Sequence, residues 1–262
     1  MRLGIIGYPV SHSLSPVIQE AALEALGIAG SYQVLSVPPE GLAAAFHRVR
    51  QRFRGVNVTI PHKIAALDFM DMLSPEAQSI GALNTVVNEK GFLTGYNTDA
   101  AGFVWAWRQA GIELAGKKVL VLGAGGAARA VAYAVHQAGG QLWVANRNRE
   151  RGLELARSFL GQVVPLTQAP QAEIIVNATS VGMTDPETSP LPEEYFPDQG
   201  AVMDLVYRPL ETKFLKLARK KGILTINGLA MLIGQGAAAF ELWTGQEAPV
   251  AAMSAALEVA VG

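Results

Sequence analysis

The stretch KVLVLGAGGAARA at residues 118–130 joins an apolar segment to an alanine-rich one through a short glycine-rich turn. Lys118–Leu122 is typical of a buried parallel strand, and Ala127–Ala138 is typical of a helix. A strand that passes through a tight turn into a helix begins a strand–helix–strand unit. This feature therefore predicts an α/β fold, in which helices cover a mostly parallel sheet.

The glycines of this turn have separate roles. Gly123 permits the tight turn, and Gly125 lets the backbone approach a pyrophosphate. The helix that begins near Gly126 then directs its free N–H groups at the phosphates. Ala128 replaces the third glycine of the usual pattern and still allows the helix to pack closely on the sheet. A ligand-free strand–helix turn is the alternative, but a strand before the glycines and a helix after them favour dinucleotide binding.

The next predicted strand, Gln141–Ala145, indicates which dinucleotide is bound. NAD sites normally carry an acidic residue at the end of this strand, where it holds the ribose 2′-hydroxyl. Here Asn146 and Arg147 take that place, and Arg149 and Arg151 follow. Guanidinium groups suit a 2′-phosphate, and cations are otherwise unfavourable at the start of a helix. A solvated basic surface is the alternative, and the pattern favours NADP over NAD.

Strand and helix patterns alternate along the rest of the chain. In residues 1–100 we expect strands at Leu3–Gly7, Tyr32–Val37 and Gly55–Ile60, a hairpin of Asn84–Asn88 with Phe92–Tyr96, and helical segments at Ser15–Gly27, Glu40–Phe53, His62–Met70 and Ser74–Ser79. Beyond them we expect strands at Ile174–Asn177, Ala201–Asp204 and Leu224–Ile226, and helices at Asp99–Ala110, Glu150–Phe159, Thr212–Lys221, Leu229–Leu242 and Pro249–Val261.

These elements predict two α/β domains. Residues 1–100 with 238–262 form an N-terminal, mostly parallel α/β domain, and residues 101–237 form a Rossmann-type, doubly wound dinucleotide-binding domain.

Composition narrows the class of protein. Half of the 262 residues are hydrophobic and 16% are charged, so the chain can bury substantial cores. A formal net charge of −1 gives no electrostatic reason to expect nucleic acid or a membrane as partner. The absence of cysteine excludes disulfides and thiol nucleophiles, and the four histidines lack metal-ligand spacing. We expect a soluble cytoplasmic protein, monomer or homodimer, that acts on a small molecule without a metal.

Further motifs follow one another in a fixed order along both halves. They are SHSLSP at 11–16, NVTIPHK at 57–63, GALNTV at 81–86, GYNTDAAG at 95–102, GAGGAARA at 123–130, ANR at 145–147, NATSVGM at 177–183, DLVY at 204–207 and NGLAMLIGQGA at 227–237. With these motifs the chain resembles the shikimate dehydrogenase family from near its N-terminus to its last helices. Asn148 departs from the pattern, because many relatives have threonine there.

The resemblance implies an NADP-dependent reduction of 3-dehydroshikimate to shikimate, a step of aromatic amino acid biosynthesis. It implies Lys63 as the acid–base group and Asp99 as the residue that holds the lysine ammonium and a substrate hydroxyl. A small cyclohexene carboxylate with several hydroxyls needs many hydrogen-bonding partners. The substrate-binding residues implied by the resemblance are Ser13, Ser15, Asn57, Thr59, Asn84, Tyr207 and Gln235.

For the cofactor, the glycine turn, the basic segment and the resemblance together give a larger set. The expected cofactor-binding residues are Gly123, Ala124, Gly125, Gly126, Ala127, Asn146, Arg147, Arg149, Arg151, Thr179, Leu205, Gly228 and Met231.

Taken singly, several of these residues have ordinary structural interpretations. Ser15 before Pro16 is typical of a helix N-cap, and Lys63 could be a surface lysine. Asn57 and Thr59 share one face of a predicted strand, with Val58 and Ile60 expected to face the core. The motifs as a set favour the functional interpretation.

Three alternative functions stay open. The first is a quinate or shikimate dehydrogenase that uses NAD. The second is another two-domain dehydrogenase, such as a methylenetetrahydrofolate dehydrogenase, whose flat pterin would need stacking aromatics that residues 57–63 lack. The third is a non-catalytic dinucleotide-binding sensor, against which Lys63 and Asp99 argue.

Overall fold

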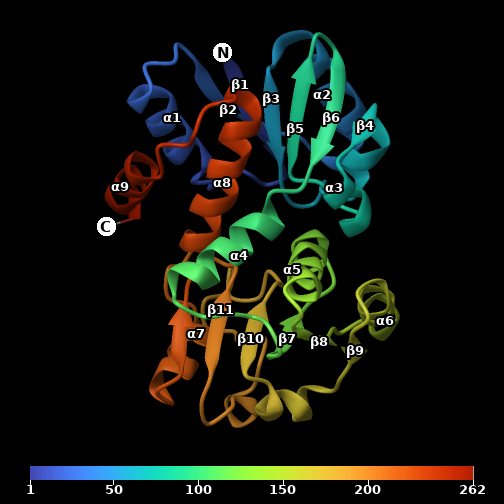
Figure 1. Cartoon of the computed structure of the whole chain (residues 1–262), viewed down its shortest axis with the longest axis vertical. Coiled ribbons are helices and arrows are strands. Elements are labelled where there is room, and N and C mark those ends of the chain that lie inside the picture. Colours follow the sequence, from blue (N-terminus) through green and yellow to red (C-terminus); the bar gives the residue numbers. More distant parts are fainter. Residues whose placement is uncertain (262) are drawn as a thin grey trace. The chain divides into compact units, whose positions relative to one another are not determined.

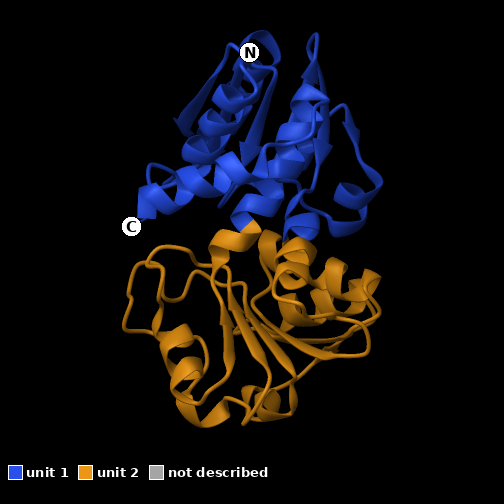
Figure 2. Cartoon of the chain, turned by 60° about the vertical axis from the view of Figure 1, so that its left-hand side comes forward, with its two compact units in different colours: residues 1–102, 232–262 blue, residues 103–231 orange. Residues whose placement is uncertain are grey.

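The computed structural model describes residues 1–261, which form two compact units. One unit comprises Met1–Gly102 with Leu232–Gly262, and the other comprises Phe103–Met231 (Figure 2). The second boundary, expected between residues 237 and 238, falls between residues 231 and 232. It lies inside one continuous helix, α8 (Gly228–Thr244), so no break in the sequence pattern marks it.

The first unit is built on a six-stranded sheet in the order β2-β1-β3-β5-β6-β4 (Figure 1). Its strands are β1 (Arg2–Gly7), β2 (Ser31–Ser36), β3 (Gly55–Val58), β4 (Met72–Leu73), β5 (Thr85–Glu89) and β6 (Phe92–Tyr96). β1 pairs in parallel with β2 and β3, and β4 pairs in parallel with β6. β5 runs antiparallel to both β3 and β6, and β5 and β6 form the predicted hairpin.

Helices cover both faces of this sheet. The helical segments are α1 (Ser15–Ala25), a 3-10 turn at Pro39–Gly41, α2 (Leu42–Arg52), a second 3-10 turn at Ala65–Phe69, α3 (Pro75–Ile80), the C-terminal part of α8, and α9 (Val250–Val261). Phe46 and Val49 of α2 belong to one core cluster with Val56 and Val86 of the sheet. Trp243 of α8 packs near Tyr32 and donates its indole N–H to the carbonyl of Val86 over 2.9 Å. α1 packs on α9.

The helical segment expected at His62–Met70 is a 3-10 turn at Ala65–Phe69. Two other local expectations for this unit were wrong. Ser15 is the first residue of α1 and not its N-cap, which is Leu14. The strand at Gly55 ends at Val58, so the alternation of faces stops there, and Ile60 is 55% exposed. The helix thus begins one residue earlier than the sequence pattern suggests, and the strand ends two residues earlier.

The second unit has a fully parallel six-stranded sheet in the order β12-β11-β10-β7-β8-β9. Its strands are β7 (Lys118–Leu122), β8 (Gln141–Ala145), β9 (Gln162–Val163), β10 (Ile174–Asn177), β11 (Ala201–Asp204) and β12 (Leu224–Ile226). The helical segments are α4 (Asp99–Gln109), which begins in the first unit, α5 (Gly126–Gln137), α6 (Arg149–Ser158), α7 (Lys213–Lys220), and 3-10 turns at Leu166–Gln171 and Glu193–Tyr195.

This strand order is the doubly wound arrangement that the sequence predicts. From β7 the chain proceeds to β8 on one side of the sheet, and it returns to β10 on the other side of β7. In such sheets ligands bind outside the carboxyl ends of the strands, where the order reverses. The carboxyl ends of β7, β10 and β11 are therefore the positions at which to look for a cofactor site. Within residues 1–261 no helix is long and apolar enough to cross a membrane.

Candidate active site

An ion pair between Lys63 and Asp99 lies at one edge of the first unit. Lys63 follows β3, and Asp99 is the first residue of α4. The lysine Nζ lies 2.5 Å from the Oδ2 of Asp99. The two side chains are only 14% and 6% exposed. The alternative interpretation of Lys63 as a surface lysine is therefore wrong.

Asn84 connects this ion pair to the neighbouring polar groups. Its Nδ2 lies 2.9 Å from the Oδ1 of Asp99, 2.9 Å from the Oγ1 of Thr98 and 3.2 Å from the Oε1 of Gln235. Its Oδ1 accepts a hydrogen bond from the backbone N–H of Thr98 over 2.7 Å. Both oxygens of Asp99 thus accept a hydrogen bond, one from Asn84 and one from Lys63, and the carboxylate is held in one orientation.

The ammonium group of Lys63 keeps donors for a ligand. A lysine ammonium has three N–H donors. In the described chain its one hydrogen-bond partner is Asp99. An ammonium fixed on one side by a buried carboxylate can direct its remaining protons at an oxygen beside it, and it can transfer one of them.

Strand topology explains why these residues meet. Lys63 comes after the carboxyl end of β3, and Asp99 after that of β6. Asn84 precedes β5, which runs antiparallel to both strands, so its beginning lies at the same edge of the sheet as their ends. Ser13 and Ser15 follow the carboxyl end of β1, which is parallel to β3. The fold therefore gathers polar residues from distant parts of the sequence along one edge.

Asn57 and Thr59 differ in how much hydrogen-bonding capacity they keep. The Oδ1 of Asn57 accepts a hydrogen bond from the hydroxyl of Tyr32 over 2.6 Å, and its Nδ2 donates to the carbonyl of Asn84 and the Oγ1 of Thr85. Asn57 is 4% exposed and thus braces the segment of Asn84. Thr59 is partly exposed, and its hydroxyl has no hydrogen bond within residues 1–261.

Ser13, which precedes the N-cap Leu14, binds the first backbone N–H of α1. Its Oγ accepts a hydrogen bond from the backbone N–H of Ser15 over 3.2 Å, at the start of α1. Ser15 is itself 4% exposed. Two hydroxyls and the first N–H groups of a helix thus lie together, a combination suited to a carboxylate.

The turn between β7 and α5 has the geometry that a pyrophosphate needs. Gly123 has φ +112°, and a Cβ there would lie 3.1 Å from Thr179 Cγ2, so the position requires glycine. A Cβ on Gly125 would meet nothing within 4 Å, so its backbone borders open space. Gly125 is the N-cap of α5, and no side chain caps the helix. The N–H groups of Gly126 and Ala127 are therefore free to bind an anion, and the turn fits a dinucleotide.

The basic segment after β8 is exposed and available for a ligand. Arg147, Arg149 and Arg151 are all exposed, and their guanidinium groups make no hydrogen bond or ion pair within the described chain. Asn148 is the N-cap of α6, because its Oδ1 accepts from the N–H of Arg151 over 3.1 Å. Asn146 donates to the backbone carbonyl of Asn148 over 2.7 Å. Asn148, which stands where many relatives have threonine, thus caps the N-terminus of α6.

Of the remaining expected cofactor residues, Thr179 and Leu205 follow the carboxyl ends of β10 and β11, and Gly228 and Met231 belong to the start of α8. Thr179 donates both its N–H and its hydroxyl to the Oδ1 of Asn177. A Cβ on Gly228 would lie 2.6 Å from the carbonyl oxygen of Leu205, so these two backbones are in close contact. Met231 is 7% exposed on the same helix as Gly228. Tyr207 belongs to this second unit, whereas the other expected substrate residues belong to the first.

Sequence reasoning missed a buried polar cluster in the second unit. Asn177, Asp204 and Thr212 are all 0% exposed, and Asn177 and Thr212 each donate a hydrogen bond to Asp204. Two of them lie in the motifs NATSVGM and DLVY, from which only Thr179, Leu205 and Tyr207 were expected to be functional. An aspartate at the end of an apolar strand was the available signal, because a buried carboxylate needs dedicated partners.

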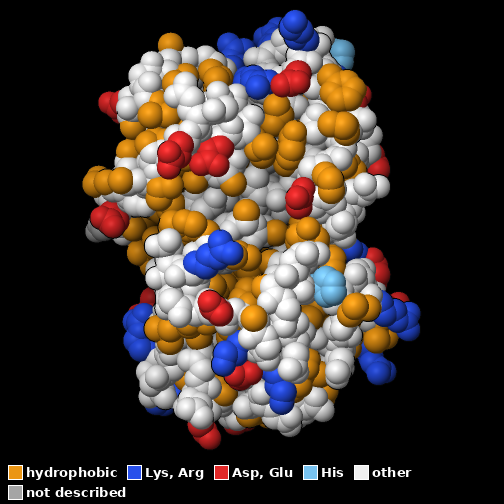
Figure 3. Space-filling model, in the orientation of Figure 1, with side chains coloured by type: hydrophobic (Ala, Val, Ile, Leu, Met, Phe, Trp, Pro, Cys, Tyr) orange, Lys and Arg blue, Asp and Glu red, His pale blue; other side chains and the backbone are white. Residues whose placement is uncertain are grey.

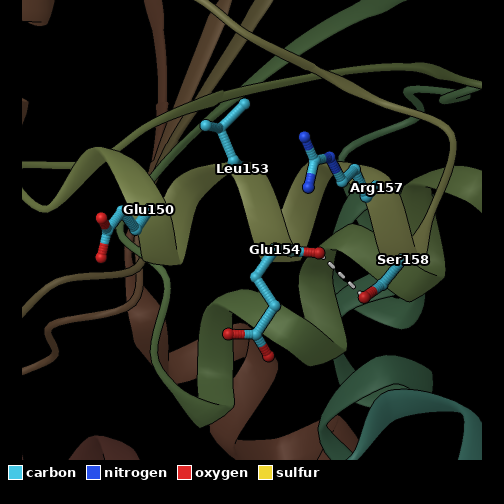
Figure 4. A pocket seen from close by; sticks show the side chains of 5 residues that line it. All are labelled: Glu150, Leu153, Glu154, Arg157 and Ser158. Carbon is cyan, nitrogen blue, oxygen red and sulfur yellow. Dashed lines mark hydrogen bonds between the residues drawn. The ribbon is translucent and has the colours of Figure 1, made fainter.

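His62, the surface of α6 and the exposed charged side chains offer fewer groups for catalysis or binding. His62 is 1% exposed and its Nε2 bonds the carbonyl of Val37, so it has a packing and hydrogen-bonding role. A surface depression on α6 is lined by Glu150, Leu153, Glu154, Arg157 and Ser158, all from one helix (Figure 4). Basic and acidic side chains are interspersed on the face seen in Figure 3. Among residues 1–261 no group of histidine and acidic side chains could hold a metal ion.

Comparisons with known proteins match both units. Residues 5–86 match the shikimate dehydrogenase substrate binding domain, residues 106–184 the shikimate/quinate 5-dehydrogenase model, and residues 228–258 the shikimate 5′-dehydrogenase C-terminal domain. An NADP-dependent shikimate dehydrogenase of Thermus thermophilus is 52% identical over 262 residues, which is 100% of this chain and 99% of that protein. The chain belongs to the shikimate dehydrogenase family.

Solved structures agree with this family assignment. A crystal structure of a Thermus thermophilus shikimate 5-dehydrogenase in complex with NADP(H) and shikimate has a TM-score of 0.95, 51% identity and 99% coverage of both chains. A 5-ketofructose reductase of Gluconobacter has a TM-score of 0.87 at 31% identity, covering 99% of this chain and 98% of that one. The shikimate dehydrogenase fold thus also occurs in an enzyme named for another substrate, and specificity has to be argued from side chains.

Burial raises the pKa of Asp204 from 3.8 to about 6, although hydrogen bonds from Thr212, Val206 and Asn177 oppose the shift. Because the folded protein binds this proton more tightly than the unfolded chain, Asp204 adds stability below its unfolded pKa and loses it as the pH rises through about 6. The free energy of unfolding of the wild type, relative to Asp204→Asn, should therefore fall by about 3 kcal/mol between about pH 4 and about pH 7.

Urea unfolding of both proteins across this pH range measures the difference, and the carboxylates that the two proteins share cancel. A difference that stays constant with pH would mean that Asp204 titrates as an ordinary exposed carboxyl.

Proposed function

We propose that this chain is a shikimate dehydrogenase that interconverts shikimate and 3-dehydroshikimate with NADP. The observation that carries the proposal is the buried Lys63–Asp99 pair, held by Asn84 at the sheet edge that also carries Ser13, Ser15 and Thr59. The relative that is 52% identical over the full chain is named for this activity, and a structure 51% identical to this chain contains NADP(H) and shikimate.

The substrate residues divide by the chemistry of the ligand. Ser13 and Ser15, at the start of α1, suit the carboxylate. Thr59 offers a hydroxyl that has no hydrogen-bond partner among residues 1–261, and Gln235 and Asn84 offer amide groups beside Asp99. Asn57 acts mainly by bracing Asn84, because its own donors are already in use. Tyr207 is carried from the family motif and contributes its phenol to the same ligand.

Lys63 moves the proton. When the ring carbonyl is reduced, its oxygen develops negative charge, and Lys63 Nζ donates a proton to it. In the oxidation direction the neutral amine takes the proton from the ring hydroxyl. Asp99 stays ionised, holds the ammonium in place and accepts a hydrogen bond from a neighbouring substrate hydroxyl. No metal is needed in this scheme, because the lysine N–H groups stabilise the oxygen directly.

The residues of the second unit hold the cofactor. Gly123–Ala127 bind the pyrophosphate with backbone N–H groups, and Arg147, Arg149 and Arg151 bind the 2′-phosphate, with Asn146 beside them. Thr179, Leu205, Gly228 and Met231 border the site at the ends of β10 and β11 and the start of α8. These residues would hold NADP, which would supply the redox chemistry of the reaction.

The proposal also includes the compartment, the oligomeric state and the partners of the enzyme. We place it in the cytoplasm as a monomer or homodimer, with shikimate or 3-dehydroshikimate as its small-molecule partner and no nucleic acid. The nearest alternative is an enzyme that accepts quinate or NAD, since a Listeria monocytogenes relative at 35% identity was crystallised with shikimate and NAD. The unpaired guanidinium groups of Arg147 and its neighbours favour NADP. A sensor without catalysis would not need the Lys63–Asp99 pair.

The replacement Lys63→Met keeps most of the side chain's length and removes the transferable proton. We expect the kcat for NADP reduction by shikimate to fall about 10²–10⁴-fold, the usual contribution of general acid–base catalysis. Shikimate affinity should change much less, because the carboxylate and the other hydroxyls keep their partners. Asp99→Asn should also lower kcat, and the double mutant should be far from additive, because the two residues act as one unit.

Lys216→Met, at an exposed position of α7, is the matched control and should keep wild-type kcat. Melting temperatures of all variants separate a chemical loss from a structural one. A folded Lys63→Met enzyme with wild-type turnover would rule out this lysine as the acid–base group.

The replacement Arg147→Ala tests the choice of cofactor. It should weaken NADP binding by about 1.5–3 kcal/mol, the range for a hydrogen bond to a charged group, and leave NAD binding almost unchanged. Titration calorimetry with both dinucleotides gives the two affinities. Arg157→Ala, at the other end of α6, is the matched control and should change neither. An equal loss of affinity for NADP and NAD would show that Arg147 does not read the 2′-phosphate.

A further inference from the structure

Three segments of the second unit meet at the buried carboxylate of Asp204. The hydroxyl of Thr212 donates to its Oδ2 over 2.6 Å. The Nδ2 of Asn177 and the backbone N–H of Val206 donate to its Oδ1 over 2.9 and 3.0 Å. These donors come from the end of β10, the turn after β11 and the residue before α7. One carboxylate thus ties together three loops.

The direction of these bonds suits an ionised carboxylate. Thr212 is also the N-cap of α7, because its Oγ1 accepts from the N–H of Leu215 over 3.3 Å. Its hydroxyl hydrogen is therefore committed to Asp204. The other two groups, an amide N–H and a backbone N–H, can only donate. A protonated Asp204 could donate within this cluster only to the second lone pair of Thr212 Oγ1, and the Thr212 hydroxyl would then have to turn its own hydrogen away from the carboxyl group.

Asp204 and the carbonyl of Val181 together fix which way the amide of Asn177 points. The Nδ2 of Asn177 lies between two acceptors, Asp204 Oδ1 and the carbonyl of Val181, and only an NH₂ group can satisfy both. The Oδ1 must then face the opposite way, where it accepts from the N–H and the hydroxyl of Thr179 over 3.0 and 2.7 Å. Thr179 is fixed through Asn177.

The two loops fixed in this way border the expected cofactor site. Thr179 lies against the glycine turn, since a Cβ on Gly123 would be 3.1 Å from its Cγ2. Leu205 donates its N–H to the carbonyl of Asn177 over 3.0 Å, and its own carbonyl contacts Gly228. A shift of either loop would therefore displace the backbone at Gly123 or Gly228, which borders the expected dinucleotide site.

We propose that ionised Asp204 is a positioning residue for the cofactor, which acts through Asn177 and Val206 to hold Thr179 and Leu205 in the arrangement that binds NADP. The inference rests on the proposed function, because it assumes that the second unit binds NADP. It predicts that cofactor affinity depends on the charge of a carboxylate that touches neither substrate nor cofactor.

The surroundings of Asp204 make this charge sensitive to pH. The groups that face it from β10, the turn after β11 and α7 are all neutral, and within residues 1–261 no lysine, arginine, histidine or second carboxylate bonds to it. Burial therefore raises the pKa of Asp204 to about 6. The network is fully formed above that pH and is disturbed as the pH falls through it.

The test is equilibrium binding of NADP to the wild type and to Asp204→Asn at about pH 8 and about pH 5.5. At the higher pH we expect the variant to bind about tenfold more weakly, and at the lower pH, where about a quarter of Asp204 stays ionised, the ratio of the two dissociation constants should fall to about threefold. The 2′-phosphate also titrates in this range, but the ratio cancels its contribution. The KM for shikimate should stay within about twofold.

Asp185→Asn is the matched control, because Asp185 also accepts from a threonine hydroxyl and a backbone N–H but lies exposed in a loop. It should bind NADP as the wild type does at both pH values. Thr212→Ser keeps the hydroxyl and should bind within about twofold of the wild type, whereas Thr212→Val removes one donor and should bind several-fold more weakly. This second pair decides the question if Asp204→Asn does not fold.

A ratio that is equal at both pH values, or close to one at both, would overturn the inference and leave the proposed function intact. Equal NADP affinity of Thr212→Ser and Thr212→Val would do the same. A folded wild-type protein that binds no NADP at either pH would overturn the proposed function, and this inference with it.

Discussion

The chemistry of the first unit depends on one buried ion pair, that of Lys63 with Asp99. Each charge would be costly to bury alone, and the pair is accommodated because Asn84 satisfies the second carboxylate oxygen. Asn84 is in turn fixed by Thr98 and by the neighbouring Asn57. The result is an ammonium group of fixed position whose remaining N–H groups are free, which is the arrangement a proton donor requires.

Each unit contains a buried carboxylate, and the two units accommodate its negative charge in different ways. In the first, the buried carboxylate of Asp99 is balanced by a lysine. In the second, Asp204 has only neutral donors, so its ionised form lowers the stability of the fold at neutral pH. Buried groups that reduce stability in this way are common where a binding loop must keep one geometry. The buried negative charge of Asp204 thus both lowers the stability of the fold and holds the loops around Thr179 and Leu205 in one geometry.

The sequence predicts the architecture well and the contacts less well. The glycine turn, the strand–helix alternation and the basic segment at Arg147 each depend on local patterns, and the doubly wound sheet follows from them. The two-residue strands β4 and β9 are too short to leave a pattern. The exposure of Ile60 depends on where β3 ends, and the hydrogen bond from Ser15 to Ser13 depends on where α1 begins; contacts with neighbouring segments decide both. The Asn177–Asp204–Thr212 cluster joins residues up to 35 positions apart, so no local signal reveals that they meet.

The central claim, that Lys63 transfers the proton, is tested most directly by restoring a donor that the chain no longer supplies. Lys63→Ala leaves space for a small amine beside Asp99. The account predicts a low kcat that ethylammonium raises in a saturable manner, whereas tetramethylammonium, which has the same charge and no proton, does not. Equal rescue by both cations, or wild-type kcat in Lys63→Ala without any amine, would contradict it.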